Sequence, residues 1–237
     1  MNFDFENKTV IVTGGTGALG VSIVNTFINA NAKVIATYRD EQQAKSFWLN
    51  VPDSKNKVSL VKCELTNQQD VDNLLIKASS LGQLRALINA AGGYRYGLIE
   101  ETEEPVLNSL LDYNLKTTYL TSRSAIPFLR KSQLGSIVNV GAKAGINGEK
   151  GNGPYGISKA GVLLLTQVLD AELKRYGINV NAVLPSIIDT KTNREMMPNS
   201  DFSRWVRPTD IANLILFLAS DYARAIHGAG VPISGEI

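Results

Sequence analysis

The sequence has very few of the side chains that form disulfides or bind metals. Its 237 residues include one cysteine, Cys63, and one histidine, His227. A single cysteine cannot form an internal disulfide, and a lone histidine leaves no cluster with the ligand spacing of a zinc site. We therefore expect no metal centre in this chain.

Long apolar runs and clusters of like charge are also missing. No stretch has the length of a membrane-spanning helix, and the first ten residues, MNFDFENKTV, lack the basic start and apolar run of a signal peptide. The formal net charge is +2, and Lys and Arg are spread along the chain. These features predict a cytoplasmic protein that binds a small-molecule substrate rather than nucleic acid or a membrane.

The chain does contain a regular alternation of short β-branched apolar runs with segments of helical periodicity. The runs are continuously apolar, which is typical of strands covered by helices on both faces. The pattern predicts one α/β domain over residues 1–237, a Rossmann-type doubly wound parallel sheet of about seven strands. The strands are expected at residues 8–13, 33–37, 57–63, 84–90, 136–141, 179–184 and 229–233.

One segment, residues 189–207, interrupts this alternation. It follows the sixth predicted strand and contains Pro198, Asn199 and Ser200 before helical periodicity returns at Asp210. Loops after the carboxyl ends of parallel strands line the ligand crevice of such sheets. We therefore expect residues 189–207 to form a substrate lid.

A glycine-rich turn, TGGTGALG at residues 13–20, lies between the first strand and the helix that follows. Gly14, Gly15 and Gly17 allow the backbone to approach a pyrophosphate closely, and the start of a helix offers free N–H groups to its charge. The alternative is a tight turn without a ligand. Its position between strand and helix favours a dinucleotide-binding turn.

The end of the second strand, VIATYRD at residues 34–40, bears on the choice of dinucleotide. A carboxylate at this point accepts hydrogen bonds from the ribose of NAD, but Thr37 stands there and Arg39 follows. Thr37 and Arg39 could receive the 2′-phosphate of NADP, although an exposed arginine near Asp40 and Glu41 is the alternative. We expect NADP, with NAD as the other candidate.

Five motifs in order make the chain resemble the short-chain dehydrogenase/reductases: the glycine turn, NAAG at 89–92, Asn114 in a long helical segment, YGISK at 155–159 and LPSIIDT at 184–190. The resemblance implies an oxidoreductase, a homodimer or homotetramer, and Asn114, Tyr155 and Lys159 as catalytic residues. The expected cofactor-binding residues are Gly14, Thr16, Gly17, Leu19, Gly20, Thr37, Arg39, Glu64, Leu65, Asn89, Ala91, Gly92, Tyr155, Lys159, Pro185 and Ile188.

Tyr155 and Lys159 are four residues apart, so both project from one face of a helix. The ammonium charge of Lys159 favours a phenolate, and we expect it to lower the pKa of Tyr155, which makes the phenol a usable proton donor or acceptor. The resemblance adds a water held by Asn114 that relays protons. A surface pair on an ordinary helix is the alternative.

The residue thirteen positions before Tyr155 is Ala142, where the family has a catalytic serine. Its loss resembles the dihydropteridine reductase subgroup, which shows a similar GAKA stretch. A hydrogen-bond donor to the developing oxyanion contributes about 2.7–4 kcal/mol, so ordinary ketones would react poorly. We therefore expect hydride transfer to an activated, conjugated carbonyl- or imine-like acceptor such as a quinonoid dihydropterin, with Tyr155 as acid.

Two other functions remain open. In one, the protein is a general carbonyl or 3-oxoacyl reductase in which water or Lys143 replaces the serine. In the other, it is a dinucleotide-binding sensor that has lost catalysis, and it binds the cofactor without turning over any substrate.

Overall fold

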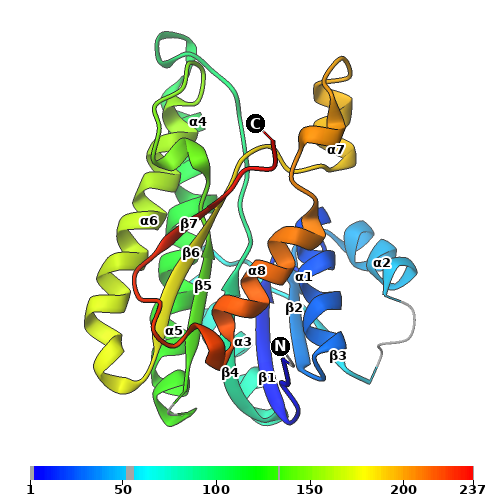
Figure 1. Cartoon of the computed structure of the whole chain (residues 1–237), viewed down its shortest axis with the longest axis vertical. Coiled ribbons are helices and arrows are strands. Elements are labelled where there is room, and N and C mark those ends of the chain that lie inside the picture. Colours follow the sequence, from blue (N-terminus) through cyan, green and yellow to red (C-terminus); the bar gives the residue numbers. More distant parts are fainter. Residues whose placement is uncertain (1–2, 52–55, 133, 237) are drawn as a thin grey trace.

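A computed structural model of the chain describes residues 3–51, 56–132 and 134–236, and its strands form one parallel sheet (Figure 1). The sheet order is β3-β2-β1-β4-β5-β6-β7, and every neighbouring pair runs parallel. This confirms the predicted single-domain Rossmann-type sheet. The strands are β1 (Lys8–Thr13), β2 (Lys33–Tyr38), β3 (Val58–Lys62), β4 (Gln83–Asn89), β5 (Ser136–Val140), β6 (Asn179–Pro185) and β7 (Gly230–Ile233).

The central strands are apolar on both faces because helices cover both. All residues of β5 and β6 are buried. On one face lie α1 (Ala18–Asn29), α2 (Glu41–Asn50) and α8 (Pro208–Ala219), and on the other lie α3 (Gln68–Leu81), α5 (Thr117–Ser132) and α6 (Gly153–Leu173). Phe27 and Ile215 belong to the first core, and Leu74 and Leu129 to the second. In the described part of the chain no helix is long and apolar enough to cross a membrane.

The expected long helical segment before β5 is present, and its middle is locally unwound. α4 (Glu104–Leu110) continues through a π-helical segment, Leu111–Lys116, into α5. Single π-helical turns are frequent at functional sites because they re-aim one side chain. The side chain concerned here is that of Asn114, which is fully buried.

The sheet reverses its strand order between β1 and β4, so the loops after these two strands diverge and leave a crevice at the carboxyl edge. Figure 1 shows α7 (Lys191–Met196) raised above that edge on one side of the crevice. On the other side, the loop after β4 meets the start of α6 through a bridge between Gly97 and Asn152.

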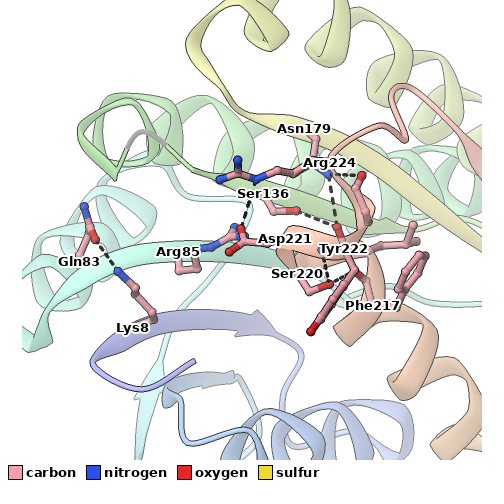
Figure 2. Close-up of polar contacts among 12 residues, drawn as sticks. Lys8, Gln83, Arg85, Ser136, Asn179, Phe217, Ser220, Asp221, Tyr222 and Arg224 are labelled. Carbon is pink, nitrogen blue, oxygen red and sulfur yellow. Dashed lines mark hydrogen bonds and ion pairs between the residues drawn. The ribbon is translucent and has the colours of Figure 1, made fainter. Parts of the chain in front are cut away.

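The amino edge of the sheet is closed by polar contacts with the end of α8 and the turn after it, drawn in Figure 2. Ser136 and Asn179, at the starts of β5 and β6, both donate to the carbonyl oxygen of Leu218. Arg85 forms an ion pair with Asp221, with an N–O distance of 3.0 Å. This edge is therefore structural, and the crevice lies at the opposite end.

Candidate active site

The glycine-rich turn after β1 is held tightly against neighbouring backbone. Gly14 has φ +63°, and a Cβ atom there would lie 2.9 Å from the Cα of Ala91. At Gly17, which precedes α1, a Cβ would meet only the carbonyl oxygen of Gly14, at 3.4 Å. No side-chain cap occupies the start of α1 among the described residues, and its first turn holds no acidic residue. The free N–H groups of this helix start therefore suit a pyrophosphate.

Thr37 lies near the end of β2, against the glycine turn. Its side chain is 1% exposed, and its Oγ1 accepts a hydrogen bond from the N–H of Gly14 at 3.0 Å. The hydroxyl thus locks the end of β2 to the glycine turn. Thr37 also lines the cavity described next, so its direct contact with a 2′-phosphate stays a prediction.

A cavity of about 830 Å³ opens above the glycine turn and the ends of β2 and β4. Gly93, on its wall, would place a Cβ in open space with no described atom within 4 Å. A long, open cavity with helix-start N–H groups at its floor fits a dinucleotide. Of the expected cofactor residues, those that line this cavity are Gly14, Thr16, Gly17, Leu19, Gly20, Thr37, Arg39, Glu64, Leu65, Ala91 and Gly92.

Asn89 does not belong to this wall. It is 2% exposed, and its amide donates to Ser122 and Asn139 while its Oδ1 accepts from Thr121. The side chain therefore ties β4 to β5 and α5. The sequence assigned it to cofactor binding, and the structure gives it a supporting role beneath the crevice.

Arg39, by contrast, is exposed at the mouth of the cavity, and its guanidinium lies 4.8 Å from the ring centroid of Tyr113. The two nearby acids are occupied elsewhere: Asp40 caps α2, and Glu41 pairs with Lys62. The positive charge of Arg39 is therefore available at the end of the cavity where the second strand stops.

Tyr155 and Lys159 lie on the first turns of α6 and line a second cavity of about 750 Å³, next to the first. Lys159 is 5% exposed and donates to the carbonyl oxygen of Val140 at 2.8 Å. Burial lowers the pKa of Lys159 to about 8, because the interior disfavours the ammonium form. Pro185 and Ile188 line the same second cavity.

The expected lowering of the Tyr155 pKa is wrong for this structure. Burial, with a smaller contribution from Tyr94, raises the pKa of Tyr155 to about 12. Lys159 Nζ lies 6.0 Å from the Tyr155 ring centroid and turns toward Val140 instead. The phenol is therefore held protonated, which suits it to give a proton rather than take one.

Asn114 connects the loop after β4 with α6. Its Oδ1 accepts from the N–H of Gly93 at 2.9 Å, while its Nδ2 donates to the Gly93 carbonyl at 3.0 Å and to Ser158 Oγ at 2.9 Å. The Asn114 carbonyl accepts from Thr118. These bonds give Asn114 a positioning role. Sequence reasoning missed Ser158, although its place immediately before Lys159 in YGISK could have drawn attention to it.

Ala142 follows β5 by two residues, lines the second cavity together with Tyr155 and is 5% exposed. Its methyl group offers no hydrogen-bond donor to this cavity. The lining also includes Glu149, Asn152 and Tyr94, and the Tyr94 ring meets that of Tyr155 edge to face with centroids 4.9 Å apart. No motif in the sequence pointed to Glu149 or Asn152 as cavity residues.

The expected lid consists of α7 and the turns that follow it. Arg194 in α7 forms a two-pronged ion pair with Asp189, with N–O distances of 2.6 and 2.7 Å, and stacks on Phe202. Met196 and Met197 of the same segment line the second cavity. The segment therefore supplies apolar side chains to the lining of the second cavity.

Comparison with known proteins gives a consistent result. The model of the family described as short chain dehydrogenase matches residues 8–201. The chain is 30% identical to the 3-oxoacyl-[acyl-carrier-protein] reductase FabG of Rickettsia felis, over 98% of this chain and 97% of that protein. It is 29% identical to the 2,5-dichloro-2,5-cyclohexadiene-1,4-diol dehydrogenase LinX of Sphingobium indicum, with 96% and 95% covered. The structure of ElxO with NADP bound superposes with a TM-score of 0.90 at 27% identity, with 97% and 98% covered.

Proposed function

Because the chain belongs to the short-chain dehydrogenase family, whose model matches residues 8–201, we propose that it reduces a conjugated carbonyl- or imine-like acceptor with a nicotinamide dinucleotide. The dinucleotide, when bound, supplies the hydride. A quinonoid dihydropterin is one acceptor of this kind.

The residues of the chain then have separate tasks. Tyr155, held protonated by burial, gives its proton to the substrate atom that gains charge. Lys159 donates a hydrogen bond to the carbonyl oxygen of Val140, and this bond holds its ammonium group beneath the crevice. Asn114 fixes the distance between the loop after β4 and α6, and thereby the width of the crevice.

The observation that carries this proposal is Ala142. A hydroxyl donor to a developing oxyanion contributes about 2.7–4 kcal/mol, and a methyl group contributes none of it. An electron-poor conjugated acceptor delocalises the incoming charge, so the donation from Tyr155 suffices. The missing hydroxyl therefore selects against simple ketones more than against activated acceptors.

A second candidate is reduction of a 3-oxoacyl substrate. The FabG relative, which matches almost the full length of this chain, favours it. In that case water or Lys143 must take over the donor role of the missing serine. Acetoacetyl thioesters distinguish this candidate, because their keto group has no extended conjugation.

For the cofactor, we propose a preference for NADP. Arg39 at the cavity mouth, the absence of an acidic residue at position 37 and the NADP complex of the similar ElxO structure support it. Thr37 fixes the glycine turn.

We also propose a homodimer or homotetramer. Exposed apolar side chains on α5 and α6, namely Tyr119, Leu164 and Val168, support it. Light scattering after size exclusion tests this directly.

The first experiment follows the oxidation of NADPH and NADH by the purified protein with quinonoid dihydropterin, an acetoacetyl thioester and small ketones. We expect the pterin to react fastest and NADPH to be preferred. Tyr155→Phe should abolish turnover while cofactor binding, followed by fluorescence, persists. Turnover of the thioester alone would replace this proposal with the second candidate.

A further inference from the structure

Three side chains on the wall of the second cavity form a chain of hydrogen bonds. Tyr94 Oη lies 3.1 Å from Asn152 Oδ1, and Asn152 Nδ2 lies 2.9 Å from Glu149 Oε2. All three residues line the cavity that also contains Tyr155 and Ala142. Tyr94 is 49% exposed, so a ligand in the cavity can reach it.

The direction of these hydrogen bonds is fixed by Glu149. An ionised carboxylate can only accept, so the amide nitrogen of Asn152 must face it. The amide oxygen then faces Tyr94, and the Tyr94 hydroxyl must donate its hydrogen to that oxygen. Burial, followed by Tyr96 and Glu149, raises the pKa of Tyr94, which keeps the hydroxyl protonated for this bond. The lone pairs of Tyr94 Oη are left for a ligand.

Two further polar side chains that line the cavity, Ser186 and Asn193, also use a hydrogen in bonds within the fold. Ser186 Oγ donates its hydrogen to the carbonyl oxygen of Ser234, and Asn193 Nδ2 donates to that of Ile188. Their oxygens remain as acceptors. With a methyl group at Ala142, Tyr155 supplies the proton to the reacting atom, and Tyr94, which packs against Tyr155, offers an acceptor next to it.

The wall is also held in place. The Tyr94 ring packs edge to face on Tyr155, with the ring planes at 86°. The main chain of the same loop is held by a hydrogen bond from the N–H of Gly97 to the carbonyl oxygen of Gly151, at 2.9 Å. The acceptor groups therefore keep a constant position relative to the catalytic phenol, which a specificity site requires.

We propose that the substrate carries an N–H or O–H donor close to its hydride-accepting carbon, and that Tyr94 Oη and Glu149 bind this donor. The proposal rests on the proposed reductase function and narrows it from conjugated acceptors in general to those with an adjacent hydrogen-bond donor. Tyr94 and Glu149 are then specificity-determining residues, and Asn152 orients Tyr94.

Isatin and N-methylisatin provide a matched test. Both are flat conjugated dicarbonyls whose C3 carbon accepts a hydride while its oxygen takes the proton of Tyr155, so that NADPH becomes NADP⁺. Only isatin has an N–H donor. One hydrogen bond is worth roughly a 2- to 12-fold difference in kcat/KM, so we expect the wild-type protein to prefer isatin by about that factor.

Three variants distinguish the loss of the hydrogen bond in N-methylisatin from the steric effect of its added methyl group. Tyr94→Phe keeps the ring packing on Tyr155 but removes the acceptor, so the preference should fall toward its purely steric value through a loss on isatin alone. Glu149→Gln, which no longer fixes the direction of the chain, should weaken the preference as well. Tyr176→Phe, far from the cavity and stacked between Arg130 and Arg175, should leave both rates unchanged.

Equal rates for the two compounds, or a preference that survives in both Tyr94→Phe and Glu149→Gln, would overturn the inference. Calorimetric binding of both compounds in the presence of NADP⁺ separates it from the reductase proposal. If neither compound is reduced but the wild type binds isatin more tightly and Tyr94→Phe does not, the inference stands and the reductase proposal fails. Equal binding without reduction overturns both.

Discussion

The N–H of Gly14 donates to the side-chain oxygen of Thr37 at 3.0 Å, which joins the glycine turn after β1 to the end of β2. This hydrogen bond holds the glycine turn, which we propose as the pyrophosphate site, against the second strand. The proposed preference for NADP over NAD then depends on the exposed Arg39, which lines the same cavity.

We therefore predict that Arg39→Ala raises the KM for NADPH roughly tenfold and leaves that for NADH nearly unchanged. Hydrogen bonds to charged groups contribute about 1.5–3 kcal/mol, and the exposure of Arg39 reduces this value. Steady-state kinetics with both cofactors provide the measurement. A parallel rise in both KM values would instead assign Arg39 to general support of the cavity through Tyr113.

Ala142→Ser should restore the missing donor. We predict that turnover of simple ketones rises by up to about 10²-fold, whereas turnover of a conjugated acceptor changes little, because only the former lacks charge stabilisation. Ala144→Ser adds a hydroxyl elsewhere on the same cavity wall and serves as the control. An equal gain in ketone turnover in Ala142→Ser and Ala144→Ser would show that the position of the added hydroxyl is irrelevant.

Lys159 should limit the stability of the protein without cofactor. Burial lowers its pKa from 10.5 to about 8, so below pH 8 the folded state carries an unfavourable buried charge. That penalty is relieved as the pH rises from 8 to 10.5, because the folded state loses the proton first. Lys159→Met should therefore abolish turnover yet stabilise the protein at pH 7 on the order of 1–3 kcal/mol.

Urea unfolding at pH 7 and pH 10 measures this effect, and the gain from Lys159→Met should shrink at the higher pH. Lys77→Met on the exposed side of α3 is the matched control and should change stability little at either pH. A gain that is the same at both pH values would contradict the assignment to Lys159 ionisation.

Thr9 and Thr13 lie four residues apart on β1 and differ in how their hydroxyls are used. Thr9 Oγ1 is buried and finds no hydrogen-bond partner in the described part of the chain, whereas Thr13 Oγ1 accepts from the N–H groups of Ala90 and Ala91, each at 3.1 Å. Thr9→Val should stabilise the protein by about 1 kcal/mol, and Thr13→Val should destabilise it by about 1–3 kcal/mol.

Thermal and urea unfolding of the two variants provide the comparison, since both make the same chemical change on the same strand. Destabilisation of Thr9→Val as large as that of Thr13→Val would mean that the Thr9 hydroxyl has a partner in solution, such as an enclosed water.

The sequence by itself determined the fold and the location of the site. Continuous apolar runs separated by amphipathic segments can bury their surface only as a parallel sheet between two helical layers, which places the glycine turn, Tyr155 and Lys159 at the carboxyl edge. These are local patterns, and each is carried by neighbouring residues of the chain.

Tertiary structure alone decided which way each polar group points. The Thr37 hydroxyl, besides lining the cavity, accepts a hydrogen bond from Gly14, and the Asn89 amide donates to Asn139, a partner distant in sequence. The pKa of Tyr155 was expected to fall, yet burial and Tyr94 raise it, while Lys159 donates its hydrogen bond to Val140. Hydrogen-bond direction and desolvation depend on all neighbours in space, and no spacing along the chain specifies them.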